Sequence, residues 1–445
     1  MKAFRKLFPL IICCVLLVAC GSEAAPTAPE TTAVPTEPVL EILDWADDIE
    51  PSSDTLKQAV TVKSFIDGDT THFFVPEEVN GEGVLKARFL AVNTPESTGK
   101  IEEYGKAASR FTKGRLENAV SILIESEDGS WNADSTGDRY LVWVWYKTEE
   151  NGPWRNLNVE LLQEGLAFAN SAANNRYGDT CMGAIAQAKA AKLHIYSGEP
   201  DPDYYYGEAV ELTLKELRCN IEQYNGMKVA FTGVVTTNSG SQGVYAEDFD
   251  PETGLCYGMY IYYGHGLNGM GLDAIAVGNL TRIVGTVQYY EVGGTWQVSD
   301  LSYEMMDPKN PNNLLKLESG HSPAYTPVEP DCFHSEITVP NGEGNLTAAW
   351  AELSLGTSVK MEGLTVVDAY TTDNAESASN GAITLLCEKN GTRIAVRTVP
   401  MKDESGNLIT QDAYLGKTID VLGIVDYFDG AYQIKVFTPD NIIIN

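Results

Sequence analysis

Two stretches in the second half of the chain repeat one pattern of glycines and strand-forming residues. The first copy comprises NGMKVAFTGVV (225–235) and VGNLTRIVGTVQYYEVGGTWQV (277–298). The second copy comprises LGTSVKMEGLTVV (355–367) and LGKTIDVLGIVDYFDGAYQI (415–434). Each copy has a loop glycine, an alternating strand that contains a further glycine, and a later aromatic hairpin. Interior strand glycines suit the tight bends of a small closed barrel, so we expect two small β-barrels here.

The preceding block, residues 57–198, begins with strand patterns and continues mainly with helical ones. Apolar residues alternate in AVTVKSFIDGDTTHFFV and VLKARFLAV, and YLVWVWY predicts a further strand. Helical spacing follows in IEEYGKAASRFTKGRLENAV, NLNVELLQEGLAFA and MGAIAQAKAAKLHIY. Strands followed by packed helices predict a small barrel with helices on one side. The expected fold class is therefore mainly β with some α.

Composition shifts divide the chain into segments. Residues 21–56 are rich in Pro, Thr, Ala and Glu, which is typical of an extended tether, and proline-rich breaks recur at 198–206 and 307–342. The expected organisation is a signal peptide at 1–19, a disordered tether at 20–56, the barrel-and-helix domain at 57–198, a first OB-like barrel at 205–308, a linker at 309–340 and a second OB-like barrel at 341–445.

The N-terminus, MKAFRKLFPLIICCVLLVACGSE, has the pattern of a secretion signal. Three basic residues precede a short apolar run, which is too short to span a bilayer comfortably. LVAC followed by Gly21 resembles the lipobox of bacterial lipoproteins, which implies that Cys20 is lipidated after cleavage. An ordinary signal peptide or an anchor helix is the alternative. We expect a lipid-anchored protein on the extracellular face of the cell membrane, with the membrane as partner through Cys20.

Charge is distributed unevenly along the chain, whose formal net charge is −31. Residues 57–198 hold 19 acidic and 15 basic residues, whereas residues 199–445 hold 34 acidic and 13 basic residues. Because the second half is so acidic, it repels polyanions at long range, and this disfavours a general role in coating nucleic acid. A local site for an anionic substrate remains compatible with this charge, since exposed charges are screened beyond roughly 10 Å at 0.1 M salt.

Three short motifs in the 57–198 block carry candidate functional side chains, and each also has a purely structural interpretation. IDGDT is typical of a hairpin turn, yet Asp67 and Asp69 beside its glycine can also bind a hard cation. NTPE fits a helix start with Thr94 as N-cap and Pro95 at the first helical position. Arg139 begins the strand pattern RYLVWVWY, where its stem can extend over apolar surface.

Together with Arg88, which lies in the strand pattern VLKARFLAV, these motifs supply the parts needed to hydrolyse a phosphodiester. A cation at the acidic turn would neutralise and orient the phosphate. Two guanidinium groups, Arg88 and Arg139, would donate paired hydrogen bonds to the phosphate oxygens, where charge accumulates. The carboxylate of Glu96 would position or deprotonate the attacking water.

These residues lie within a longer resemblance to the staphylococcal-nuclease-like family, also called thermonucleases. The matching segments cover about a third of the chain and follow the family's order: VTVKSFIDGDTTHFFV, ARFLAVNTPES, EEYGKAASRFTKGRLENA, GDRYLVWVWY, LNVELLQEGLAFA and AQAKAAKLHIY. The resemblance implies an OB-type barrel with three helices and a calcium-dependent phosphodiesterase that acts on DNA or RNA. By position, Arg88 and Arg139 would hold the phosphate, and Glu96 would manage the nucleophilic water.

The same resemblance implies a calcium site around the acidic turn. Asp69 would bind calcium directly, Thr94 would offer its backbone carbonyl, and Asp67 would support these ligands from outside. Asn93 stands where many family members have a second aspartate ligand, so its amide oxygen would take that place with one negative charge fewer. The segment NSAANNRYG after GLAFA also lacks the tyrosines that often line the family's nucleotide pocket.

The acidic second half contains the tyrosine groups MYIYYG and QYY, together with Trp296. Such rings can stack on single-stranded nucleic acid, but they also form ordinary cross-strand pairs, and an unknown surface or extracellular ligand is a further partner. Two functions therefore compete. One is a surface-anchored calcium-dependent nuclease. The other is a catalytically silent binding or adhesion lipoprotein with the same folds.

Overall fold

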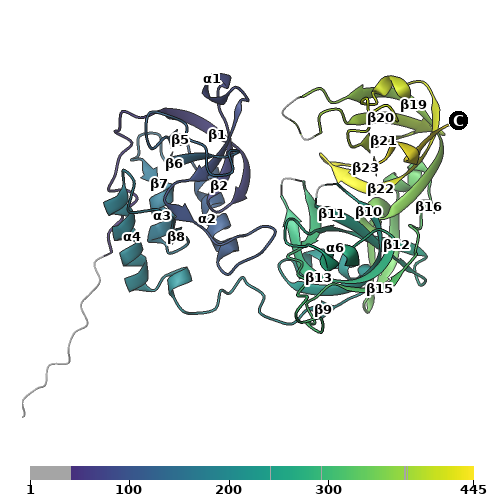
Figure 1. The fold of residues 1–445 in the computed structure, drawn as a ribbon, viewed down its shortest axis with the longest axis horizontal. Coiled ribbons are helices and arrows are strands. Elements are labelled where there is room, and N and C mark those ends of the chain that lie inside the picture. The colour runs from purple at the N-terminus through teal and green to yellow at the C-terminus, as the bar shows by residue number, and fades with distance from the viewer. Residues whose placement is uncertain (1–41, 241, 292, 375–376, 378) are drawn as a thin grey trace, which may run out of the picture. The chain divides into compact units, whose positions relative to one another are not determined.

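The computed structural model describes residues 42–240, 242–291, 293–374, 377 and 379–445. Within these residues the protein is mainly β and contains three closed five-stranded barrels, each with its own hydrophobic core (Figure 1). The expected fold class, a barrel with helices followed by two further small barrels, is confirmed.

The first barrel closes because strands from the two sides of its sheet pair with each other. The sheet order is β3-β2-β1-β5-β6-β7, and β3 also pairs with β6 in parallel. The strands are β1 (Lys57–Asp67), β2 (Thr70–Phe74), β3 (Val84–Phe89), β4 (Val92–Asn93), β5 (Ser121–Glu125), β6 (Tyr140–Lys147), β7 (Arg155–Asn156) and β8 (Phe168–Ala169). The helices are α1 (Glu77–Asn80), α2 (Gly105–Glu117), α3 (Leu157–Gln163), α4 (Gly178–Ala191) and the 3₁₀ turn η1 (His194–Tyr196).

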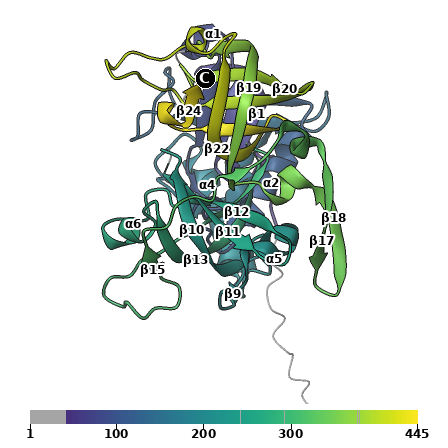
Figure 2. The ribbon, with the colours of Figure 1, turned by 90° about the vertical axis from the view of Figure 1, so that its right-hand side faces the viewer.

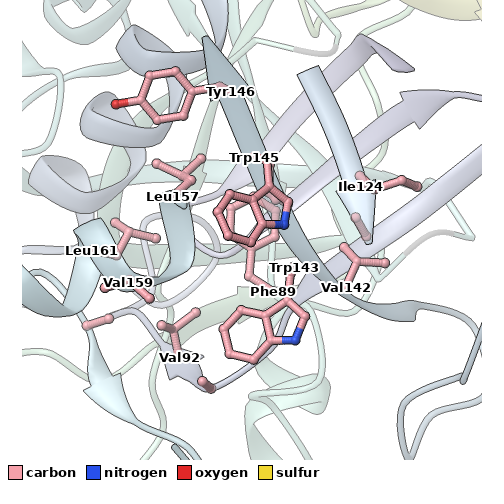
Figure 3. Packing of buried hydrophobic residues seen from close by; sticks show 14 of the residues in the cluster. Phe89, Val92, Ile124, Val142, Trp143, Trp145, Tyr146, Leu157, Val159 and Leu161 are labelled. Atoms are coloured by element: carbon pink, nitrogen blue, oxygen red, sulfur yellow. The ribbon is translucent and has the colours of Figure 1, made fainter. Parts of the chain in front are cut away.

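Strand β6 supplies the centre of the first core. All residues from Val142 to Tyr146 are buried, so both faces of this strand pack against other groups. Figure 3 shows the indoles of Trp143 and Trp145 in one cluster with side chains of α3, among them Leu157. A continuous apolar run of this length, rather than an alternating one, is what a strand buried on both faces requires.

The three longer helices of the first barrel overlap the segments predicted to be helical, but their ends differ. Helix α3 ends at Gln163 and Phe168–Ala169 form β8, while α4 begins at Gly178 and ends at Ala191. The pattern predicted a helix from Ile101, but α2 begins at Gly105. Tyr104 has a φ of 64°, a left-handed conformation that a right-handed helix cannot include. Helix α3 begins at its N-cap Asn156, whose side chain accepts a hydrogen bond from Val159 N at 3.0 Å.

The two sequence repeats fold into barrels with the same pairing order. Strands β10–β14 close through a β10–β13 pair, and strands β19–β23 close through a β19–β22 pair. The second barrel and its flanking elements comprise β9 (Val210–Glu211), α5 (Leu214–Cys219), η2 (Ile221–Tyr224), β10 (Lys228–Asn238), β11 (Gly243–Asp250), β12 (Leu255–Tyr262), α6 (Met270–Ala274), β13 (Asn279–Tyr290), β14 (Thr295–Ser299) and β15 (Leu315–Ser319).

The third barrel and its flanking elements comprise β16 (Thr326–Pro327), η3 (Pro330–His334), β17 (Glu336–Asn341), β18 (Gly344–Ala349), α7 (Trp350–Leu353), β19 (Ser358–Thr371), β20 (Ile383–Lys389), β21 (Thr392–Thr398), η4 (Gln411–Ala413), β22 (Thr418–Phe428), β23 (Ala431–Val436), η5 (Pro439–Asn441) and β24 (Ile442–Ile444).

Glycines at equivalent places in the second and third barrels explain part of the glycine pattern that the two sequence copies share. A Cβ on Gly285 would lie 2.6 Å from the Ser299 carbonyl oxygen, and one on Gly423 would lie 2.8 Å from the Lys435 carbonyl oxygen. Both strands therefore approach their neighbours too closely for a side chain.

Segments expected to be linkers also contact the cores. Within the expected tether, Ala46 is fully buried and Trp45 Nε1 donates to Gln187 Oε1 at 3.3 Å, so residues 42–56 pack on the first barrel. Within the expected 309–340 linker, β15 joins the sheet of the second barrel, and Val339 is buried in the second core. Figure 2 shows β17 and β18 as a long hairpin.

The expected signal peptide and Cys20 lie outside the described residues. Among the helices that the structure describes, none combines the length and the apolar character needed to cross a bilayer.

Candidate active site

The acidic turn between β1 and β2 buries both of its carboxylates. Gly68 and Asp69 form a two-residue hairpin turn, as the IDGDT motif predicted. Asp67 accepts hydrogen bonds from Gly68 N at 2.8 Å and from Ser97 Oγ at 2.7 Å. A Cβ on Gly68 would lie 2.9 Å from Ala108 Cβ, so glycine allows α2 to pack directly on the turn.

The loop after β4 holds Thr94 and Glu96 against this turn. Thr94 N donates to Asp69 Oδ2 at 2.8 Å, and no helix begins at Pro95, so the N-cap interpretation of NTPE is wrong. This hydrogen bond to the Asp69 carboxylate, which belongs to the turn between β1 and β2, fixes the conformation of the loop at Thr94. A Cβ on Gly105 would overlap the Glu96 carbonyl oxygen, so glycine at the start of α2 leaves room for the loop.

Arg88 links the acidic turn to Asn93. Its guanidinium pairs with the Asp69 carboxylate and donates from Nη2 to Asn93 Oδ1 at 2.5 Å. The parallel pairing of β3 and β6 brings Arg139, which precedes β6, close to Arg88. Burial and the neighbouring Arg139 charge lower the pKa of Arg88 from its ordinary value. Two nearby guanidiniums repel each other, so an anion bound between them is favoured.

Asp134 is a candidate functional residue that the sequence analysis missed. Its Oδ2 accepts a hydrogen bond from Arg139 Nε at 2.8 Å, and its Oδ1 accepts one from Thr136 N at 3.0 Å. Burial acts to raise the pKa of Asp134, but these hydrogen bonds and the Arg139 charge prevail and lower it. The segment DSTGDR could have indicated this role, because Asp, Ser and Gly together favour a tight turn, and such a turn can bring the Asp134 side chain close to Arg139.

Glu96 lies beside the Asp67 carboxylate. Partial burial raises the pKa of Glu96, and a hydrogen bond and charge repulsion from Asp67 raise it further, to about 7, against the opposing effect of Arg88. A carboxylate with a pKa near neutrality suits a general base, which must accept a proton at the working pH. The structure thus brings together the catalytic and metal-site residues expected from the sequence: Asp67, Asp69, Arg88, Asn93, Thr94, Glu96 and Arg139.

We expect the Glu96 carboxyl of the calcium-free protein to titrate near pH 7, and an Asp67→Asn substitution to lower this midpoint by removing a like charge. Because the folded-state pKa is raised, the stability that this group contributes is present below about pH 4.5 and is lost as the pH rises to about 7. Carboxyl-carbon NMR titration measures the midpoint. A midpoint at the ordinary value of glutamate, or one unaffected by Asp67→Asn, contradicts the proposed coupling.

The donor atoms around the acidic turn fit calcium in their chemistry. Among the described residues, no group of three or more His, Cys, Asp or Glu side chains is arranged to hold a metal ion. The candidate ligands are of mixed kind instead: the Asp69 carboxylate, the Asn93 amide oxygen and the Thr94 carbonyl. All are oxygen donors, as calcium prefers. The Thr94 hydroxyl is also buried there without a hydrogen-bond partner among the described residues. This donor set fits calcium once Arg88 releases Asp69 and Asn93.

Comparison with known proteins leads to the same region of the chain. A family described as staphylococcal nuclease homologue matches residues 86–198. A thermonuclease from Staphylococcus intermedius is 33% identical over 150 residues, which is 33% of this chain and 80% of that protein. A thermonuclease from Staphylococcus hyicus is 32% identical over 149 residues, which is 33% of this chain and 79% of that protein. Through its first barrel, which carries the acidic turn and the two neighbouring arginines, the chain belongs to the staphylococcal nuclease family.

Proposed function

We propose that the first barrel hydrolyses phosphodiester bonds of DNA, RNA or both, with calcium as its cofactor. The observation that carries the proposal is the meeting of Arg88, Arg139 and Glu96 beside the Asp69 carboxylate. Membership of the family supports the same chemistry, because the matched relatives are named thermonucleases.

In this proposal the two arginines bind the scissile phosphate. Their N–H groups donate to the non-bridging oxygens, where negative charge accumulates as water attacks. Glu96 accepts the proton of that water, which requires its ionised form. Calcium, held by Asp69, Asn93 and the Thr94 carbonyl, would neutralise further phosphate charge when bound. Asp134 holds the Arg139 guanidinium in its orientation, because the Asp134 carboxylate accepts a hydrogen bond from Arg139 Nε.

We also infer that the activity is presented outside the cell on a lipid anchor. The support for this part of the proposal is the lipobox pattern that ends at Cys20, preceded by a basic and then an apolar segment. The tether-like composition of residues 21–41 is consistent with a domain held at some distance from a membrane surface.

A catalytically silent binding protein is the alternative function. It is favoured by exposed aromatic rings on the second barrel, where Tyr289 and Tyr290 are 46% and 42% exposed. The presence of Asp69, Arg88 and Arg139 argues against it, because a domain used only for binding has no need of a buried carboxylate paired with Arg88 and of a second arginine beside that pair.

Digestion of nucleic acid by the full chain distinguishes the two functions. The protein is incubated with linear DNA and with RNA, in millimolar calcium and in excess chelator, next to a Glu96→Gln variant that keeps the side-chain shape. We expect cutting that depends on calcium, and a loss of about 10²–10⁴-fold in the variant. If the folded protein cuts neither polymer in calcium, the proposed function is wrong. Unchanged cutting by Glu96→Gln contradicts only the role of Glu96.

A further inference from the structure

A pocket of about 430 Å³ lies beside β8, and the proposed function assigns it no role. This volume is within the range of small-molecule binding sites. We call it the Phe168 pocket, and its lining residues are Glu103, Tyr104, Phe168, Ile195, Gly198, Glu199, Pro200 and Tyr206. Its walls are therefore mostly aromatic or apolar, and its charged groups are two carboxylates.

The outer wall of the Phe168 pocket is held rigidly by the buried side chain of Asp201. Asp201 is 3% exposed, and its Oδ2 accepts a hydrogen bond from Tyr104 N at 2.6 Å. The Tyr206 hydroxyl accepts a hydrogen bond from Asp201 N at 2.9 Å and donates to Glu103 Oε2 at 2.6 Å. Tyr104 Oη donates to the Glu199 carbonyl oxygen at 2.9 Å. The wall is thus organised before any ligand arrives, which lowers the entropic cost of binding.

The Phe168 pocket adjoins the candidate active site through a strand pair. Phe168 in β8 lies directly opposite Asn93 in β4, whose side chain accepts the hydrogen bond from Arg88. Cα atoms of directly opposed antiparallel residues lie about 4.5–5.5 Å apart. A nucleotide next to the scissile phosphate can therefore reach this pocket. Phe168 is 48% exposed, so its ring presents a free face.

Aromatic walls and carboxylates together select a planar ring that carries hydrogen-bond donors. Bases stack on aromatic side chains, and ionised carboxylates only accept hydrogen bonds. The Glu199 side chain makes no hydrogen bond or ion pair with any residue that the structure describes, so it is available to a ligand. A negatively charged phosphate is disfavoured at the same place by the charges of Glu103 and Glu199.

We propose that the Phe168 pocket binds one nucleobase of the substrate strand and prefers guanine. Guanine presents its N1–H and 2-amino donors side by side, which matches one carboxylate. Adenine and cytosine present one amino group next to an acceptor nitrogen, and thymine and uracil flank their single N–H with two carbonyl oxygens. That a nucleic-acid strand lies beside the pocket rests on the proposed nuclease function. The affinity of the pocket for guanine does not depend on that function.

Binding of nucleosides to the full chain tests this proposal without any cleavage. Guanosine, adenosine, cytidine and uridine are compared by saturation-transfer NMR in excess chelator, because nucleosides lack the phosphate that the arginines would bind. We expect the strongest saturation for guanosine, and at least about fivefold weaker guanosine binding in Phe168→Ala, since the variant loses the stacking ring. Glu199→Gln should abolish the preference for guanosine over uridine.

A matched control is Phe249→Ala, which removes a phenylalanine of similar exposure (56%) from β11 of the second barrel. This variant should bind guanosine as the parent protein does. Equal binding of guanosine and uridine by the parent protein, no binding of guanosine, or undiminished binding by Phe168→Ala each overturns the proposal. Guanosine binding without nuclease activity would overturn the proposed function and leave the pocket assignment standing. Nuclease activity without guanosine binding would overturn the pocket assignment and leave the proposed function standing.

Discussion

An Arg88→Lys variant is expected to fold normally and to lose about 10²–10³-fold in turnover of nucleic acid. Lysine keeps the positive charge, but it lacks the planar fork of N–H donors that contacts Asp69 and Asn93 in this structure and would contact two phosphate oxygens after their release. Only one point of contact would then remain for the phosphate oxygens in the transition state. Steady-state rates with DNA at saturating calcium measure the loss, and thermal unfolding checks the fold.

Arg393→Lys is the matched control for this variant. Arg393 also lies on a strand, β21, and pairs with a carboxylate, Glu388, but it is 63% exposed and belongs to the third barrel. We expect unchanged turnover there. Turnover of Arg88→Lys close to that of the parent protein would remove Arg88 from the proposed mechanism, because a charge alone would then be sufficient.

An Asn93→Asp variant is expected to bind calcium about tenfold more tightly, which corresponds to about 1.4 kcal/mol. The substitution keeps the oxygen that now accepts the Arg88 hydrogen bond and adds one negative charge. Calcium affinity rises with the number of charged ligands, and a doubly charged ion gains more from the added charge than the competing guanidinium does. The calcium concentration needed for half-maximal cutting should fall by the same factor.

In contrast, Asp69→Asn should reduce calcium binding below detection, because the only carboxylate proposed to bind the ion directly is lost while the hydrogen bond from Thr94 N can persist. Calorimetric titration with calcium measures both variants without reference to activity. Asn345→Asp on the exposed β18 strand serves as the control and should leave the affinity unchanged. An unchanged affinity of Asn93→Asp would exclude Asn93 as a ligand and with it the assignment of this position from the family.

Local chemistry in the sequence was sufficient for much of this fold. The Asp-Gly pair of IDGDT predicted the turn between β1 and β2, because glycine and aspartate favour tight hairpin turns whatever lies around them. The repeated glycines, such as Gly285 and Gly423, predicted two equivalent barrels, since close approach between neighbouring strands excludes a side chain. The candidate residues Asp69, Arg88 and Glu96 were also predicted, because their chemical types are few and their spacing matches a known family.

Tertiary contacts decided the features that local patterns left open. NTPE fits a helix start by propensity, yet the hydrogen bond from Thr94 N to buried Asp69 directs this segment into a loop. The break at 198–206 has the composition of a linker, but its buried Asp201 binds Tyr104 N and builds a pocket wall. In each case a buried carboxylate from a distant element accepts a hydrogen bond from a backbone N–H that a helix start leaves without an intrahelical acceptor.

The neighbouring positions of Arg88 and Arg139 show the same division most clearly. Each arginine was predicted from its own strand pattern, but only the parallel pairing of β3 with β6, which closes the barrel, brings the two guanidiniums together. Sequence patterns report which face of a strand is buried, because that information has a period of two residues. They carry no comparable signal for which distant strand becomes the partner, since that choice depends on how the whole core packs. The sequence alone therefore predicted both arginines as candidate residues, whereas barrel closure decided that they are neighbours.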